Sequence, residues 1–262
     1  MTIALGILAR DGLVLAADTQ ETYGEAWKGE HGKIGALSWH NAEASCRSSV
    51  AISGAGDGDY IDALSESIRD RCGAQKGAFR NADLKALVTD EVRTFHEKFV
   101  VPWNNRPNAP ELQLLIAASL GHGGRSLLKT NMSVTVDAQP FAAVGLGAAL
   151  ANSLMARWVR MPFCDIYQTA VIAGMIVYQV KESIPAVGKN TDIFVINATD
   201  AFSYLSRETS RQIDVLAERY LRDLEPHHMR GLLGAVKQIG VTPATMTEDF
   251  AAMVAQIKTD IG

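Results

Sequence analysis

The most constraining feature of this sequence is a pair of apolar runs at its beginning, separated by a short polar turn. Residues 2–9 are apolar and partly β-branched, Arg10-Asp11-Gly12 interrupts them, and a second apolar run over 13–17 ends at Asp18. Two runs of this kind on either side of an Asp-Gly turn are typical of a β-hairpin. The chain is therefore predicted to begin with a hairpin.

The order of the later elements indicates an α+β fold. Apolar residues recur every three or four positions between Ile61 and Phe95, which predicts helices there. Strands are predicted at 33–37, 49–52, 112–118, 126–129, 141–144 and 192–196, helices at 148–159 and 165–182, and a helical tail from about 203 with breaks near Pro226 and Pro243. Strands grouped with strands, and helices with helices, favour antiparallel layers. We expect one domain over 1–200 and a C-terminal helical extension over 201–262.

Composition excludes several classes of function. The 262 residues are 47% hydrophobic and 21% charged with a net charge of -4, as in an ordinary soluble protein without a basic surface for nucleic acid. No apolar stretch reaches the roughly 20 residues that span a bilayer. Cys46, Cys72 and Cys164 are scattered, which argues against a disulfide framework or a zinc site. We expect a cytoplasmic protein with no cofactor and no nucleic-acid or membrane partner.

An ordered set of motifs begins with the run from Thr2 through Gly6 to Ala16-Ala17-Asp18. This run resembles the start of the β-type subunits of proteasomes. The similarity continues through Lys33-Ile34, the turns at 53–57 and 144–147, and the segment 187–196, so that it covers roughly residues 2 to 197. It implies a four-layer α-β-β-α sandwich of the N-terminal nucleophile (Ntn) hydrolase type, which assembles into rings and cleaves polypeptides inside a chamber.

The resemblance implies four catalytic residues, Thr2, Asp18, Lys33 and Gly54, and their chemistry fits these roles. A threonine hydroxyl is a weak nucleophile that needs a base. Once Met1 is removed, Thr2 would carry its own base, an α-amino group that titrates near 7.7–8.0 in peptides. Lys33 would depress the pKa of that amine and pair with Asp18. Gly54, expected in a turn entering a helix, would donate its backbone N–H to the oxyanion.

The hairpin register offers a test of this arrangement. If Arg10-Asp11-Gly12 is a three-residue loop with Gly12 at positive φ, Ala4 faces Asp18 and Thr2 lies about 7 Å along the same face, a gap that a lysine can bridge. A two-residue loop would instead put Thr2 and Asp18 on opposite faces.

The match to the proteasome pattern is incomplete. Leu146 occupies the position of a serine in the family's Gly-Ser-Gly turn, and ungapped alignment puts Ile184 and Val187 at the family's supporting aspartate and serine. Glu182 or Ser183 could replace them only with a small insertion.

Three functions therefore remain open. The first is a threonine peptidase that acts on peptides or unfolded proteins within a homo-oligomeric ring or helical assembly, to which an ATP-dependent unfoldase could deliver substrates. The second is a small-amide Ntn hydrolase. The third is a non-catalytic, proteasome-like structural subunit. In an assembly, the tail is expected to pack on a neighbouring subunit or an outer surface.

Overall fold

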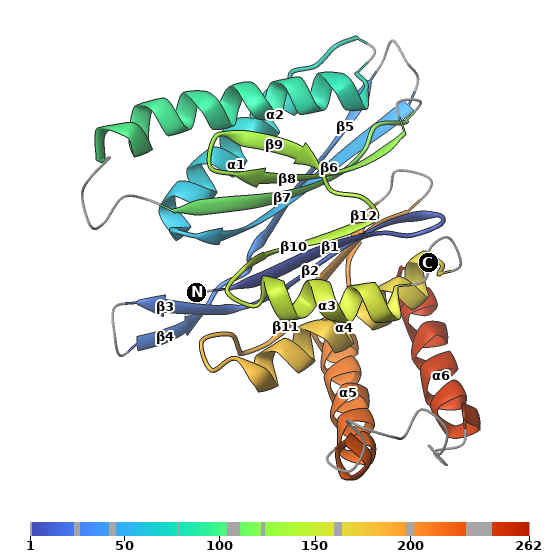
Figure 1. The fold of residues 1–262 in the computed structure, drawn as a ribbon. Coiled ribbons are helices and arrows are strands. Elements are labelled where there is room, and N and C mark those ends of the chain that lie inside the picture. The colour runs from blue at the N-terminus through green and yellow to red at the C-terminus, as the bar shows by residue number, and fades with distance from the viewer. Residues whose placement is uncertain are drawn as a thin grey trace.

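A computed structural model describes residues 2–23, 27–41, 46–77, 79–103, 111–121, 124–159, 164–197, 202–228 and 243–261. The N-terminal hairpin forms the centre of a five-stranded antiparallel sheet (Figure 1). Its strands lie in the order β10-β1-β2-β11-β12, with bounds β1 Ile3–Leu8, β2 Gly12–Asp18, β10 Phe141–Gly145, β11 Thr191–Asn197 and β12 Phe202–Tyr204. The predicted hairpin is confirmed, whereas β12 was not predicted.

A second antiparallel sheet faces the first. Its five strands follow chain order and are β5 Ile34–Asn41, β6 Cys46–Gly56, β7 Leu112–Ser119, β8 Arg125–Asn131 and β9 Val134–Asp137. A separate pair, β3 Gln20–Tyr23 and β4 Trp27–Glu30, follows β2. Of these seven strands, β3, β4 and β9 were not predicted.

Helices cover the outer face of each sheet, as Figure 1 shows. Helices α1 (Gly58–Gly73) and α2 (Asn81–Phe95) pack on the second sheet, and α2 continues into a π-helical turn over His96–Val100 and a 3-10 turn over Val101–Trp103. Helices α3 (Ala148–Trp158) and α4 (Ile166–Ser183) pack on the first sheet. The predicted α+β class with antiparallel sheets is confirmed.

The space between the sheets holds a third apolar cluster. Leu13 and Leu15 of β2 meet Leu115 of β7 and Leu127 of β8 there, and all four side chains are buried. Alternate residues of β1 and β2 thus face this cluster and the cluster under α4, which explains why both strands are apolar at almost every position.

The C-terminal helices join the same core. Helices α5 (Arg207–His228) and α6 (Pro243–Ile261) lie against α4 of their own chain and bury Ile213, Ala217 and Ile257 in its apolar cluster. The predicted break at Pro226 is wrong, because α5 continues to His228.

Two features are absent from the described part of the chain. None of its helices combines the length and apolar character that crossing a membrane requires. Its His, Cys, Asp and Glu side chains form no group of three that could hold a metal ion.

Candidate active site

The turn of the N-terminal hairpin has two residues, not three. Leu8 pairs with Leu13, and the Ala9 N–H donates to the Gly12 carbonyl at 2.9 Å, so Arg10 and Asp11 alone form the loop. The predicted three-residue loop, which placed Ala4 opposite Asp18, is therefore wrong.

The reason lies in what Asp11 and Gly12 contact. The Asp11 carboxylate accepts the Ile166 N–H at 2.8 Å, at the start of α4. A Cβ on Gly12 would lie 2.3 Å from Ile166 Cδ1 and 2.5 Å from the Ile196 carbonyl oxygen. Gly12 thus serves close packing inside a strand, and the turn shortens by one residue.

This register places Thr2 and Asp18 on opposite faces of the hairpin. Ala4 pairs with Ala17, so the same register continued by one residue sets Ile3 opposite Asp18. Ile3 faces the α4 side and Ala4 the space between the sheets, which by alternation puts Thr2 on the inner face. The Asp18 side chain nevertheless contacts the start of β1, because its Oδ1 accepts the Ile3 N–H at 2.9 Å.

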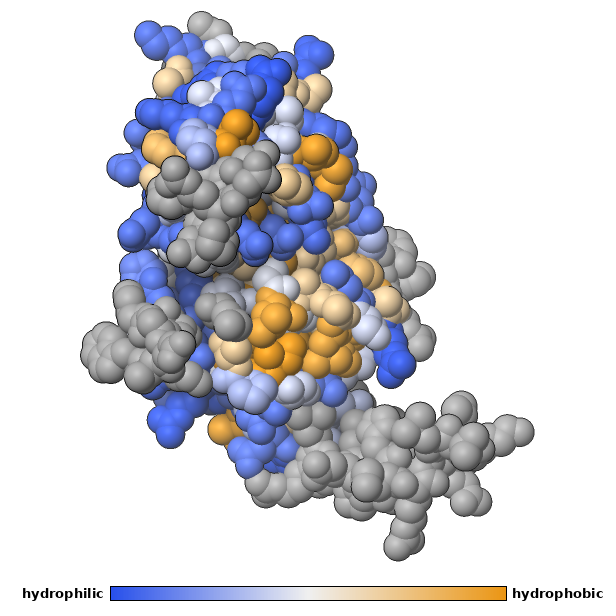
Figure 2. All heavy atoms as spheres, turned by 60° about the vertical axis from the view of Figure 1, so that its left-hand side comes forward, coloured by the Kyte–Doolittle hydropathy of each residue, from blue (hydrophilic) through white to orange (hydrophobic). Residues whose placement is uncertain are grey.

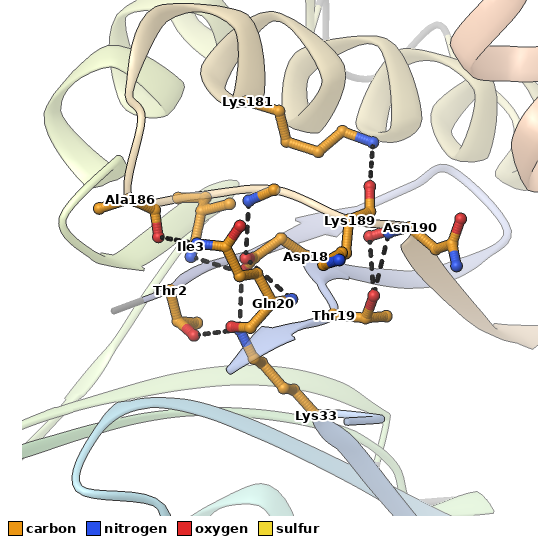
Figure 3. Close-up of polar contacts among 11 residues, drawn as sticks. Thr2, Ile3, Asp18, Thr19, Gln20, Lys33, Lys181, Ala186, Lys189 and Asn190 are labelled. Carbon is orange, nitrogen blue, oxygen red and sulfur yellow. Dashed lines mark hydrogen bonds and ion pairs between the residues drawn. The ribbon is translucent and has the colours of Figure 1, made fainter. Parts of the chain in front are cut away.

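Lys33 brings the two faces together just before β5 begins (Figure 3). Its ammonium donates to Asp18 Oδ1 at 3.0 Å, to Thr2 Oγ1 and to the Gln20 carbonyl. A protonated lysine has three N–H donors, and each has an acceptor here. Lys33 thus bridges Thr2 and Asp18 as predicted, although the two residues lie on opposite faces of the hairpin and not on the same face.

Burial shapes the electrostatics of this cluster. The Asp18 side chain is fully buried, and besides Ile3 and Lys33 it accepts N–H groups from Gln20 at 3.3 Å and Gly188 at 3.2 Å. The Lys33 side chain is 11% exposed. Desolvation lowers the pKa of Lys33 below its ordinary value, and the charge and hydrogen bond of Asp18 oppose that shift only in part. The ammonium is thus more acidic than in solution.

A second acid, Asp192 of β11, holds the backbone of Lys33 and was missed as a site residue. Asp192 carries a backbone hydrogen bond from Lys33, and a Cβ on Gly32 would lie 3.5 Å from its Oδ2. Burial raises the pKa of Asp192, while the charge of Arg207 opposes that rise. Little in the sequence marks Asp192 as a site residue. It is an acid near the start of β11, one residue after Thr191, which pairs with Asp18.

The turn after β10 holds the backbone of Thr2. The Leu146 N–H donates to the Thr2 carbonyl at 3.0 Å. Gly145 has φ +94°, and a Cβ there would lie 2.1 Å from the Thr2 carbonyl oxygen and 2.9 Å from Ala55 Cβ. Only glycine fits this contact. The Leu146 side chain is 56% exposed.

Gly54 does not lie in a turn. It is inside β6, where it pairs with Leu114, and α1 begins only at Gly58. The argument from a helix N-terminus is therefore wrong for Gly54. Ser53 of β6 pairs with Ile34, the first residue of β5, so Gly54 lies just beyond the start of β5. It is one residue before Ala55, the neighbour of Gly145.

The structure gives neither Glu182 nor Ser183 a contact with Thr2. The Ser183 hydroxyl donates to the Gln179 carbonyl within α4 at 2.8 Å, and Glu182 is exposed. Val187 is buried in the apolar cluster under α4. Among the described residues, no acid or serine from this segment takes the supporting role.

Fold and site together define a class: two facing antiparallel sheets between helices, with a threonine at the start of the first strand beside a Lys–Asp pair. Solved structures of Anbu proteins share this fold. The chain superposes on the Anbu complex of Pseudomonas aeruginosa, described as a helical assembly, with TM-score 0.70 at 14% identity over 87% of this chain and 96% of that one.

Two further Anbu structures agree. Anbu of Hyphomicrobium sp. strain MC1 gives TM-score 0.68 at 16% identity, and Anbu of Yersinia bercovieri, described as an ancestral β-subunit, gives 0.68 at 13%. Each alignment covers 86% of this chain and 97% of the other. No protein-family model and no curated protein sequence matches the chain. At these identities the likeness shows the fold.

Proposed function

We propose that this chain is a threonine-type peptidase with the four-layer Ntn-hydrolase sandwich, and that Thr2 is its nucleophile. The observation that carries the proposal is the Lys33 ammonium, which donates to both Thr2 Oγ1 and the buried Asp18 carboxylate. A cation beside the hydroxyl stabilises the negative charge that develops on this oxygen during attack.

The proposed base is the α-amino group that Thr2 gains when Met1 is removed. The nearby Lys33 charge favours the free amine, because a like charge lowers the pKa of an ammonium. The contacts that Ile3 N–H makes with Asp18 and that the Thr2 carbonyl makes with Leu146 N–H fix the backbone on the C-terminal side of this amine. Nucleophile and base would thus be oriented by the same strand end.

In the proposed reaction, Thr2 Oγ1 attacks the substrate carbonyl carbon and its proton passes to the α-amino group. The C–N bond then breaks and the leaving amine takes that proton. Water attacks the resulting ester, gives one proton back to Oγ1 and releases the carboxylic acid. We propose the Gly54 N–H as the oxyanion donor, since Gly54 lies beyond the start of β5 and next to Ala55 at the site.

The proposed substrates are peptides or unfolded polypeptides, and the proposed functional unit is a homo-oligomeric ring or helix. The helical assembly of Pseudomonas aeruginosa Anbu supports the oligomer through the shared fold. An ATP-dependent unfoldase remains a proposed partner on the strength of the proteasome resemblance.

Hydrolysis of fluorogenic peptides tests the proposal. The wild-type protein should cleave at least one peptide of a varied set, and Thr2→Ala should lose at least about 10³-fold in rate, since removing a nucleophile leaves only residual catalysis. Thr259→Ala is the matched control, because Thr259 is an exposed threonine on α6 that bonds its own helix. Equal rates for Thr2→Ala and wild type would reject Thr2 as the nucleophile.

A structural subunit is the second candidate. Leu146 in place of the family's serine, and the outward positions of Glu182 and Ser183, favour it because the amine then lacks its usual supporting groups. A small-amide Ntn hydrolase would use the same Thr2 site. It would differ from a peptidase in cleaving none of the fluorogenic peptides.

A further inference from the structure

A second buried lysine lies behind the site. Lys181 of α4 donates to the Asp214 carboxylate at 2.8 Å, to Thr191 Oγ1 at 2.7 Å and to the Lys189 carbonyl at 3.3 Å (Figure 3 shows the last of these). Its side chain is 8% exposed and that of Asp214 is 22% exposed. Thr191 also donates to Asp214, at 3.3 Å. One ammonium thus joins α5, the start of β11 and the loop before it.

That loop, residues 184–190, folds over Asp18. The Gly188 N–H donates to Asp18 Oδ2 at 3.2 Å. Asn190 and Thr19 exchange two bonds of 3.0 Å: Thr19 N–H to the Asn190 carbonyl, and Asn190 N–H to Thr19 Oγ1. The loop is therefore fastened to the strand end that carries the catalytic aspartate.

The loop holds an unfavourable backbone conformation next to this contact. Lys189 has φ +63°, in the left-handed region that residues other than glycine rarely adopt. A side chain at its neighbour Gly188 would displace Gln20, since a Cβ would lie 2.6 Å from Gln20 Oε1. Such a conformation persists when surrounding contacts hold it, and the bond from Lys181 to the Lys189 carbonyl is one of them.

We propose that Lys181 and Asp214 are positioning residues for the Thr2 site. Asp214 orients the Lys181 ammonium, which holds the Lys189 carbonyl and Thr191, and the loop so fixed keeps the Gly188 N–H on Asp18. Asp18 in turn holds Lys33 against Thr2. The C-terminal helix α5 thereby supports the site from behind. The catalytic part of this inference rests on the proposed function, whereas the placement of the loop does not.

Replacing the Lys181–Asp214 ion pair separates a role in stability from a role in positioning the loop. Replacing a buried pair by apolar residues of similar size is often neutral for stability. The double variant Lys181→Met, Asp214→Leu should therefore unfold near the wild-type temperature and yet lose the bonds that Lys181 makes to the Lys189 carbonyl and to Thr191. Arg219→Met is the matched control. Arg219 is on α5, as Asp214 is, and among its described contacts it pairs only with Asp249 of α6, at 2.7 Å.

Two readouts test the double variant and the control: hydrogen exchange of the Gly188 amide, and the rate at which a β-lactone probe acylates Thr2. We expect exchange at Gly188 to rise and acylation to fall, each about tenfold, the change that one lost hydrogen bond makes. Arg219→Met should change neither. Wild-type exchange in the double variant, or faster exchange with unchanged acylation, would overturn the inference. If wild-type Thr2 does not react at all, the proposed function fails, and the exchange measurement alone tests whether Lys181 and Asp214 hold the loop in place.

Discussion

At the scale of single residues, the site depends on one desolvated ammonium. Lys33→Met removes the only cation that contacts Asp18 among the described residues and leaves a fully buried carboxylate with backbone N–H donors alone. We expect this variant to lose about 3 kcal/mol in free energy of unfolding, since breaking a buried pair on one side is costly. It should also stop reacting with probes at Thr2. Chemical denaturation and probe labelling measure the two effects.

The control for this variant is Lys85→Met. Lys85 of α2 pairs with Asp137 of β9 on the surface, and both side chains are well exposed. Exposed pairs contribute at most about 1 kcal/mol. If Lys33→Met were no more destabilising than Lys85→Met, the central ion pair would not hold the site together.

The pH dependence of stability offers a second test at Lys33. Its pKa is lowered in the folded state, so between that value and the ordinary 10.5 the unfolded chain binds a proton that the folded chain does not. The pH-dependent part of the contribution of Lys33 to the free energy of unfolding is therefore full above 10.5 and is lost as pH falls through the folded pKa. The stability difference between wild type and Lys33→Met should grow as pH rises through this window. A flat or shrinking difference would contradict the burial of the ammonium.

The resemblance to proteasome β-type subunits pointed to Thr2, Lys33 and Asp18, and the chemistry of their side chains fits the roles that it implies. Gly188 and Leu146 contribute only backbone N–H groups, which every residue except proline has, so their contacts with Asp18 and Thr2 could not be predicted from their residue types. Gly12 was misassigned for a related reason. A glycine after aspartate signals positive φ, but here it makes room for Ile166.

At the scale of elements, the turn after β10 sets the position of Thr2. Gly145→Ala would force φ +94° on an alanine and bring its Cβ against the Thr2 carbonyl. We expect at least about 2 kcal/mol of destabilisation and slower probe labelling. Gly73→Ala is the control, since its Cβ would meet only the tip of Leu37 at 3.1 Å. Equal effects of the two substitutions on labelling would argue that the turn after β10 does not position Thr2.

Helix α5 allows a matched pair of substitutions two residues apart. Ile213 is fully buried and packs against Gly174 of α4, whereas Val215 is 50% exposed. Ile213→Ala should cost about 2–5 kcal/mol in free energy of unfolding, and Val215→Ala about 0.5 or less. Thermal or chemical denaturation compares them. Equal and small losses would show that α5 is not part of the core.

The elements that the sequence predicted were those with long apolar patterns. Helix α4 and strands β1, β2 and β7 bury most of their residues, so their periodicity is strong. Strands β3, β4, β9 and β12 have only three or four residues each, which is too short for a clear apolar pattern. Strand β6 extends beyond its predicted end through Gly54 because pairing with β7, rather than propensity, decides where it stops.

At the scale of the whole molecule, the proposed assembly should be visible in solution. Figure 2 shows apolar side chains gathered across the middle of one face, between hydrophilic regions. Large exposed apolar residues include Met132 at 66% and Val134 at 55%. We expect light scattering to give a mass of many times 28.2 kDa. A monomer at high concentration would contradict the ring or helix, although not the Thr2 chemistry.

The central claim is that Thr2, freed of Met1, is a working nucleophile beside Lys33. The most direct measurement is the intact mass of the purified protein before and after treatment with an epoxyketone or β-lactone probe. The account predicts a mass without Met1 and a single adduct that is absent in Thr2→Ala and present in Thr259→Ala. A protein that keeps Met1, or a free Thr2 that takes up no probe, would contradict it and favour the structural subunit.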